Sequence, residues 1–201
     1  MISVAPTTLR DRQRRTTVDT ILAAVGICLA DPALATLNFT QVAEVAGVGE
    51  RTIYRHFPTK DALLNAWWAQ HKAKIGQPDF PDTPAAVAAF PLRAFPLMDK
   101  DNAIMRGAVL SPQGRAMTLA HNDKRQAAFL KTVKDVAPDL CAQSQRDLAA
   151  IIQLLQSATA WLTLKDYWGL DGEQAGAAAS VAITTLLNAA AQESYQKETK
   201  T

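Results

Sequence analysis

The sequence has few of the residue types that build metal centres and disulfide frameworks. It contains two cysteines, Cys28 and Cys141, which lie far apart and belong to no CxxC pair. Its three histidines, His56, His71 and His121, are equally dispersed. We therefore expect two reduced thiols, no metal and no cofactor. A disulfide-switched protein is the alternative for the two cysteines.

Signatures of enzyme chemistry are also missing. The chain has no GxSxG, HExxH, P-loop or dinucleotide-binding fingerprint, and these patterns are the ones that place nucleophiles, metals or phosphates at defined spacings. The carboxylates are scattered along the chain, as is typical of solvated helix faces. We predict that the protein is not an enzyme.

Long hydrophobic runs are absent as well. No apolar stretch is long enough to span a bilayer, and no basic segment is followed by the short apolar segment of a signal peptide. With 201 residues, 48% of them hydrophobic and 20% charged, the chain can bury the core of one large or two small domains. We expect a cytoplasmic globular protein without membrane contact.

The most informative stretch, residues 38–57, predicts two short helices joined by a tight turn. Asn38 is a favourable N-cap for a helix that begins one residue later. Gly47 supplies the left-handed backbone conformation that ends this helix. A second helix follows over residues 50–56, with Ile53 facing inward. This pattern is typical of a helix-turn-helix, whose second helix enters the DNA major groove. The alternative is an ordinary helical hairpin whose polar residues are only solvated.

Positive charge is concentrated around this stretch. Residues 1–60 contain seven Lys or Arg against five Asp or Glu, whereas the remaining residues contain fourteen of each. Four arginines stand together near the N-terminus: Arg10, Arg12, Arg14 and Arg15. We expect a flexible basic arm there, with phosphate contacts from the last two of them. For the first two, a solvated tail is the alternative.

The segment AGVGERTIYRHFPTKDALL, with NFTQVAEV before it, resembles the DNA-binding domain of TetR/AcrR-type bacterial transcriptional regulators. The resemblance is close from about Arg14 to Leu64 and beyond that concerns only length and helical layout. It implies an all-α homodimer with a three-helix N-terminal DNA-binding domain and a larger C-terminal helical domain. In these terms the chain divides into a flexible basic arm (1–13), a helix-turn-helix domain (14–60) and a regulatory and dimerisation domain (61–201).

The resemblance also implies roles for the polar residues of the motif. Those at positions that approach bases are Thr40, Glu50, Arg51 and Tyr54. Those at positions that hold phosphates are Asn38, Thr52, His56 and Lys60, while Arg55 matches either role. The implied function is a transcriptional regulator, in particular a repressor that binds a palindromic double-stranded DNA operator as a dimer and is released by a small-molecule inducer.

The C-terminal part is expected to be helical throughout. Pro91 and Pro96 lie in an apolar segment, residues 85–98, so a broken or kinked helix is predicted there. A helix is predicted over residues 113–136, and the longest one from about residue 137 to the stop at Gly169.

Gaps beside a kinked helix favour a ligand cavity, although plain core packing is the alternative for each residue in it. The candidate lining residues predict a mostly apolar inducer that makes one hydrogen bond. They are Phe90, Phe95, Met98, Met105, Phe129, Thr159 and Trp161.

The last two helices are candidates for a four-helix bundle with a second copy of the chain. Residues 172–197 are rich in alanine, and small side chains let helices approach closely. Candidate interface residues are Leu155, Leu162, Trp168, Ala179, Ile183 and Leu186. Packing within the chain is the alternative. The alternative function is a helical carrier or enzyme for small hydrophobic molecules that has only non-specific affinity for DNA.

Overall fold

The computed structural model describes residues 8–31, 37–75, 81–120 and 122–198, and every regular element within them is a helix. The eleven helices in these ranges are α1 (Leu9–Ala30), α2 (Phe39–Ala46), α3 (Glu50–His56), α4 (Lys60–Ile75), α5 (Pro84–Lys100), α6 (Asn102–Leu110), α7 (Pro112–Ala120), α8 (Asn122–Val136), α9 (Ala142–Leu155), α10 (Ala158–Trp168) and α11 (Gly172–Glu198). The predicted all-α fold is confirmed.

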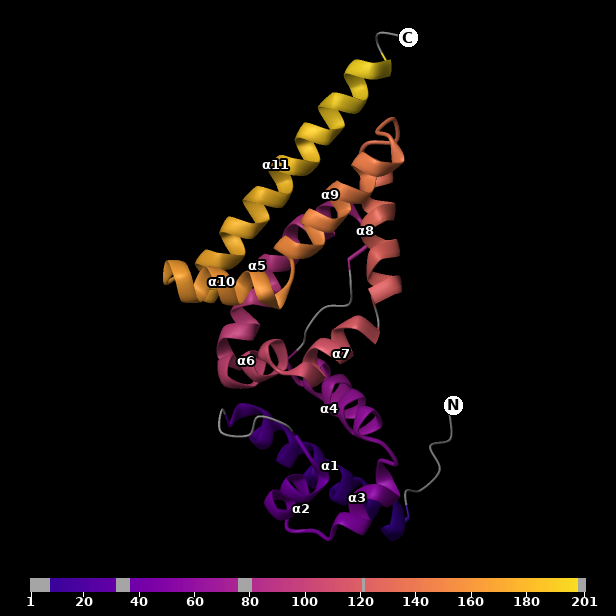
Figure 1. Ribbon diagram of the computed structural model, residues 1–201, viewed down its shortest axis with the longest axis vertical. Helices are drawn as coiled ribbons and strands as arrows, with labels where there is room; N and C mark the ends of the chain where they lie inside the picture. Colours follow the sequence, from indigo (N-terminus) through magenta and orange to yellow (C-terminus); the bar gives the residue numbers. More distant parts are fainter. Residues whose placement is uncertain (1–7, 32–36, 76–80, 121, 199–201) are drawn as a thin grey trace, which may run out of the picture.

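The molecule is elongated, with α1, α2 and α3 at one end and α11 leading to the other (Figure 1). Helix α4 runs from the first group toward the larger helical body. Within that body α11 packs along α5, and α8 pairs with α9. No single described helix is long and apolar enough to cross a membrane, and α9 with α10 meets that test only as a bent pair.

The predicted helix-turn-helix is present at the expected residues. The side chain of Asn38 accepts a hydrogen bond from Gln41 N at 2.8 Å and caps α2. Gly47 has φ 64°, and its N–H donates to the carbonyl of Glu44 at 3.2 Å. Residues that carry a Cβ atom rarely adopt this left-handed backbone conformation. Glycine therefore lets the chain turn from α2 into α3.

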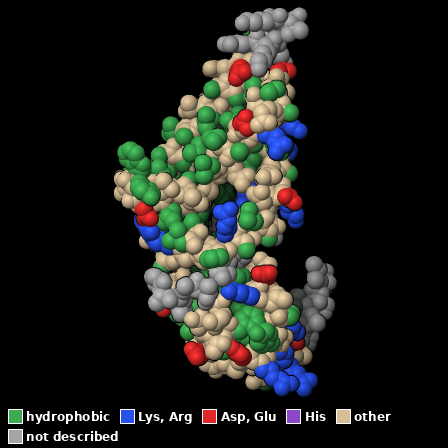
Figure 2. Space-filling view, viewed as in Figure 1, with side chains coloured by type: hydrophobic (Ala, Val, Ile, Leu, Met, Phe, Trp, Pro, Cys, Tyr) green, Lys and Arg blue, Asp and Glu red, His purple; other side chains and the backbone are tan. Residues whose placement is uncertain are grey.

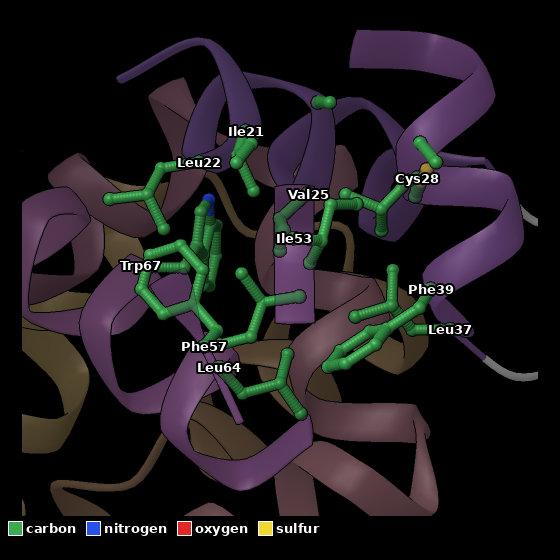
Figure 3. Packing of buried hydrophobic residues seen from close by; sticks show 14 residues of the cluster. Ile21, Leu22, Val25, Cys28, Leu37, Phe39, Ile53, Phe57, Leu64 and Trp67 are labelled. Atoms are coloured by element: carbon green, nitrogen blue, oxygen red, sulfur yellow. The ribbon is translucent and has the colours of Figure 1, made fainter. Parts of the chain in front are cut away.

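One apolar core holds these helices together (Figure 3). Ile53 of α3 is fully buried among residues of α1 and α4, including Val25 and Leu64. Phe39 of α2 and Trp67 of α4 belong to the same core. Burial of Ile53 sets the rotation of α3, so its polar residues are left on the outer surface.

The N-terminal arm differs from the prediction, because α1 already begins at Leu9. The side chain of Thr8 accepts from Asp11 N, and the Asp11 carboxylate accepts from Thr8 N, which is a complete capping box. Arg10 and Arg12 of the expected arm therefore lie on the same helix as Arg14 and Arg15, and a flexible arm over residues 8–13 is wrong. Residues 1–7 of that arm lie outside the described residues.

Helix α5 continues through both Pro91 and Pro96, so the expected break is absent. A proline has no N–H to donate to the carbonyl four residues earlier, which for Pro91 is that of Val87. The buried side-chain amide of Gln156 donates to this carbonyl instead. A hydrogen bond from the C-cap residue of α9 thus replaces the one that Pro91 removes.

Two helices predicted as continuous are divided. Residues 113–136 fall into α7 and α8, because α7 packs on α6 and α4 whereas α8 pairs with α9. Residues 137–168 form a turn followed by α9 and α10, which meet at an angle of 58°. Ser157 accepts from Ala160 N at 3.1 Å and starts α10 as its N-cap.

Candidate nucleic-acid interface

The outer surface of α3 carries the polar residues predicted to contact DNA. Glu50, Arg51 and Arg55 are exposed, while Thr52 and His56 are half-buried. Tyr54 is 53% exposed, and its ring packs edge-on against Phe39 with 4.5 Å between ring centroids. The aromatic contact from α2 restrains Tyr54, a supporting role for Phe39 that the residue pattern of the sequence did not indicate.

Helix α2 contributes two further residues to this surface. Thr40 is exposed, and its hydroxyl donates a hydrogen bond to the carboxylate of Glu50. Asn38 is exposed as well, with its side-chain oxygen occupied by the cap of α2. The structure therefore brings the start of α3 and the start of α2 together on one face.

A basic cluster joins α1 to α3. Burial lowers the pKa of His56, and the charges of Arg55 and Arg14 lower it further. Arg14 on α1 therefore lies close enough to α3 to act on the imidazole. Two fixed cations beside a titratable ring suit the phosphate backbone of DNA. Figure 2 shows Lys and Arg side chains gathered at this end of the molecule.

The remaining candidates border the same end. Arg15 is exposed on α1, near Asp11, whose pKa is lowered mainly by its hydrogen bonds to Thr8. Lys60 is half-buried and is the first residue of α4, where Thr59 accepts from Ala62 N at 3.1 Å. A lysine at a helix N-terminus places its charge next to free backbone N–H groups, which together favour an anion.

The candidate ligand residues are only partly gathered. Five of them share one buried cluster: Phe90, Phe95, Met98, Met105 and Trp161. Phe129 belongs to a second cluster, and Thr159 is exposed on α10, so neither joins the first group. The five residues are packed as core in this structure.

A groove of about 570 Å³ lies between α8 and α9. It is lined by Gln126, Phe129, Leu130, Gln143, Arg146, Asp147, Ala149, Ala150 and Gln153. Phe129 is the only candidate ligand residue among them. The polar residues of α9 recur here at three- and four-residue spacing, which is a signal available in the sequence.

The burial of three candidate dimer residues contradicts the prediction that they lie in a dimer interface. Ala179 and Ile183 are 2% and 0% exposed because they face the interior of their own chain, and Leu162 is buried in the same way. Leu155 and Leu186 are half-buried, and Trp168 is 75% exposed. Ala179, Ile183 and Leu162 therefore pack within their own chain, which was the alternative.

Within the described ranges, the cysteines and the acidic residues form no further site. Cys28 is buried in the core of the DNA-binding end, where burial raises the pKa of its thiol, and Cys141 is exposed; the two are not joined in a disulfide. Over the ranges that the structure describes, no three His, Cys, Asp or Glu side chains are grouped to hold a metal ion.

The comparisons with known proteins support a DNA-binding role for this surface. Residues 21–67 match the family model described as "Bacterial regulatory proteins, tetR family". The matched span begins on α1, includes the whole helix-turn-helix and ends on α4. A comparison with curated proteins finds no match to the chain. The family model and the exposed polar face of α3 together identify residues 21–67 as the helix-turn-helix DNA-binding domain of a tetR-family transcriptional regulator.

Proposed function

We propose that the protein is a repressor that binds a palindromic operator as a homodimer in the cytoplasm and is released by a small molecule. The observation that carries the proposal is the orientation of α3, whose Ile53 is fully buried and whose polar residues face outward. In this proposal, residues 14–60 form the DNA-binding domain and residues 61–201 the regulatory and dimerisation domain.

The proposed dimer surface is the outer face of α10 and α11. Between Glu173 and Glu193, α11 carries no charged residue, and its exposed positions are apolar, small or neutral polar. Val181 is 67% exposed on this face, and on α10 Tyr167 and Trp168 are 83% and 75% exposed. Figure 2 shows apolar side chains gathered over this region.

A contiguous uncharged face of this length favours association, and two helices from each copy suffice for a four-helix bundle. Trp168 stays in the proposed interface, with Leu155 and Leu186 at its edges. A twofold dimer presents two copies of α3, which is the symmetry of a palindromic operator. The two recognition helices would then occupy successive major grooves.

The inducer is proposed to bind in the cluster that contains Phe90, Phe95, Met98, Met105 and Trp161, which must open to admit it. The indole N–H of Trp161 is buried near the Asp99 carboxylate, whose pKa it helps to lower, and it meets no acceptor within strict hydrogen-bond geometry. This N–H is therefore a donor for one polar atom of a mostly apolar ligand. Phe129 and the exposed Thr159 are left out of the proposed site.

Helix α6 supports coupling between this cluster and the DNA-binding end. Met105 of α6 is part of the ligand cluster, and its neighbour Ile104 packs on the core of the DNA-binding domain. Gly107 of α6 lies against the backbone of Leu29 in α1, where a Cβ atom would come within 2.0 Å of the Leu29 carbonyl oxygen. A ligand that shifts α6 would therefore move α1, and a few kcal/mol of differential affinity is enough to release DNA.

A gel-shift experiment on genomic fragments, repeated at several salt concentrations, tests the regulator. We expect a discrete band with selected fragments that survives competitor DNA. A carrier with only non-specific affinity would bind every fragment weakly and lose them all steeply with salt. That second result would overturn the proposed function.

A further inference from the structure

We propose that Glu50 recognises a cytosine in each operator half-site and that Thr40 is the residue that positions its carboxylate. The inference rests on the proposed function, because it concerns the sequence that the regulator selects. It assigns a base to one residue and a positioning role to another.

The hydrogen bond between α2 and α3 carries the inference. The Thr40 hydroxyl donates to Oε1 of Glu50, and both residues are exposed. Glu50 is the first residue of α3, and in helix-turn-helix proteins the N-terminal residues of the recognition helix contact base edges. The bond restrains the carboxylate and leaves Oε2 available as an acceptor.

The described part of the chain brings no cation to this carboxylate. Among the described residues, no Lys, Arg or His lies within ion-pair distance of Glu50. A free negative charge on a surface that approaches phosphates weakens binding to DNA in general. The charge becomes favourable only where a base presents a hydrogen-bond donor to it.

The major groove offers two such donors. Cytosine presents its N4 amino group with no acceptor on the same base, whereas adenine presents its N6 amino group next to the acceptor N7. Guanine and thymine present the acceptors O6 and O4 to the groove. A carboxylate is therefore matched by cytosine, repelled in part by adenine, and repelled by guanine and thymine.

The position of the Glu50 carboxylate decides how sharply Glu50 discriminates cytosine from the other bases. An unrestrained glutamate side chain has several rotamers and loses that freedom when it binds a base. The bond from Thr40 selects one of them before DNA binds. Loss of the Thr40 hydroxyl should therefore lower the preference for cytosine more than it lowers affinity for DNA as a whole.

The test starts with selection of duplexes from a random pool by the full-length protein. We expect the wild type to enrich a motif with a cytosine at one position per half-site. Glu50→Ala should lose the preference at that position alone, by roughly 5- to 100-fold, and keep the rest of the motif. Glu50→Gln should shift the preference to adenine, because glutamine pairs with N6 and N7 of that base.

A modified base tests whether the N4 amino group of the selected cytosine is the donor that Glu50 binds. In N4-methylcytosine paired with guanine, the methyl group replaces the amino hydrogen that faces the major groove. Placed at the selected cytosine, it should weaken binding of the wild type about tenfold and leave Glu50→Ala unchanged.

The Thr40 variants test positioning. Thr40→Val should lower the ratio of affinities for cytosine and thymine duplexes, and Thr40→Ser should restore it. A merely structural hydroxyl would instead lower both affinities in parallel and leave their ratio unchanged, which would overturn the role of Thr40.

The outcomes are separable from those of the proposed function. Identical motifs for the wild type and Glu50→Ala would overturn the cytosine assignment while the regulator stands. A wild-type pool without any enriched motif would overturn both.

Discussion

The side-chain amide of Gln156 binds the backbone carbonyl of Val87, which is the carbonyl that Pro91 leaves without a partner in α5. The two residues are 69 positions apart, and Gln156 is 6% exposed. The bond joins the junction of α9 and α10 to α5. It replaces the helix hydrogen bond that Pro91 removes from α5.

Gln156→Leu should therefore destabilise the protein. The substitution leaves the Val87 carbonyl buried without a donor, which costs about 1–3 kcal/mol. Urea unfolding followed by circular dichroism measures the loss. Pro91→Ala in the same chain should recover most of it, because residue 91 then donates to Val87 itself. Gln153→Leu, a half-buried neighbour, is the matched control. A double variant as unstable as Gln156→Leu would contradict this explanation.

Three substitutions separate the roles of the DNA-facing residues. Tyr54→Phe and Lys60→Ala should weaken operator binding with an unchanged circular dichroism spectrum, and Lys60→Ala should reduce the salt slope by about one. Arg51→Ala should cost about 1–3 kcal/mol and also relax sequence preference. Arg93→Ala is the control, since Arg93 is exposed on α5. Unmoved affinity in all three variants would show that the DNA site lies elsewhere.

DNA binding should strengthen as the pH falls, through His56. Burial and the charges of Arg55 and Arg14 hold the pKa of His56 below 6.5 in the free protein, so its ring is neutral at pH 7. A bound phosphate favours the protonated ring and raises that pKa. Binding therefore takes up a proton, and affinity rises as the pH falls toward the pKa of His56 in the DNA complex. Anisotropy titrations with wild type and His56→Gln measure this, and equal pH profiles would exclude His56 from the effect.

The proposed dimer surface predicts the effect of a new charge. Val181→Glu places a carboxylate on the uncharged face of α11 and should give monomers at micromolar concentration, because two like charges meet across a twofold axis. Sedimentation equilibrium distinguishes the 21.7 kDa chain from its dimer. Leu119→Glu is a control on α7, where Leu119 is 55% exposed. If the wild-type chain is itself monomeric at this concentration, the proposed dimer is contradicted.

The contact between α6 and α1 predicts a coupling variant. Gly107→Ala brings a Cβ atom within 2.0 Å of the Leu29 carbonyl oxygen, so one helix must move. We expect a loss of about 1–3 kcal/mol in stability and a change in operator affinity, although Gly107 is far from α3 along the chain. Gly49→Ser is the stability control, because the space around Gly49 is open and serine is the better N-cap. An operator affinity equal to that of the wild type would argue against coupling through α6.

Local signals account for the features that the sequence predicts well. Asn38 as a cap, Gly47 in the left-handed region and Ile53 on the inner side act within a few residues of one another, and α2 and α3 have the predicted bounds. Two errors also had local signals: the capping box of Thr8 with Asp11, and Ser157 as the N-cap of α10.

Other features depend on contacts between distant segments. The donor that satisfies the Val87 carbonyl in α5 is Gln156, and only folding brings that amide to Val87. The inward side of α11 depends on α5: small residues occupy both faces of α11, so the helix alone does not distinguish Ala179 from Ala178. The sequence alone determined the helix-turn-helix, because short-range caps and spacing specify it. The tertiary structure alone decided which residues line the core and which remain for a partner, because burial is a property of the neighbours that a helix meets.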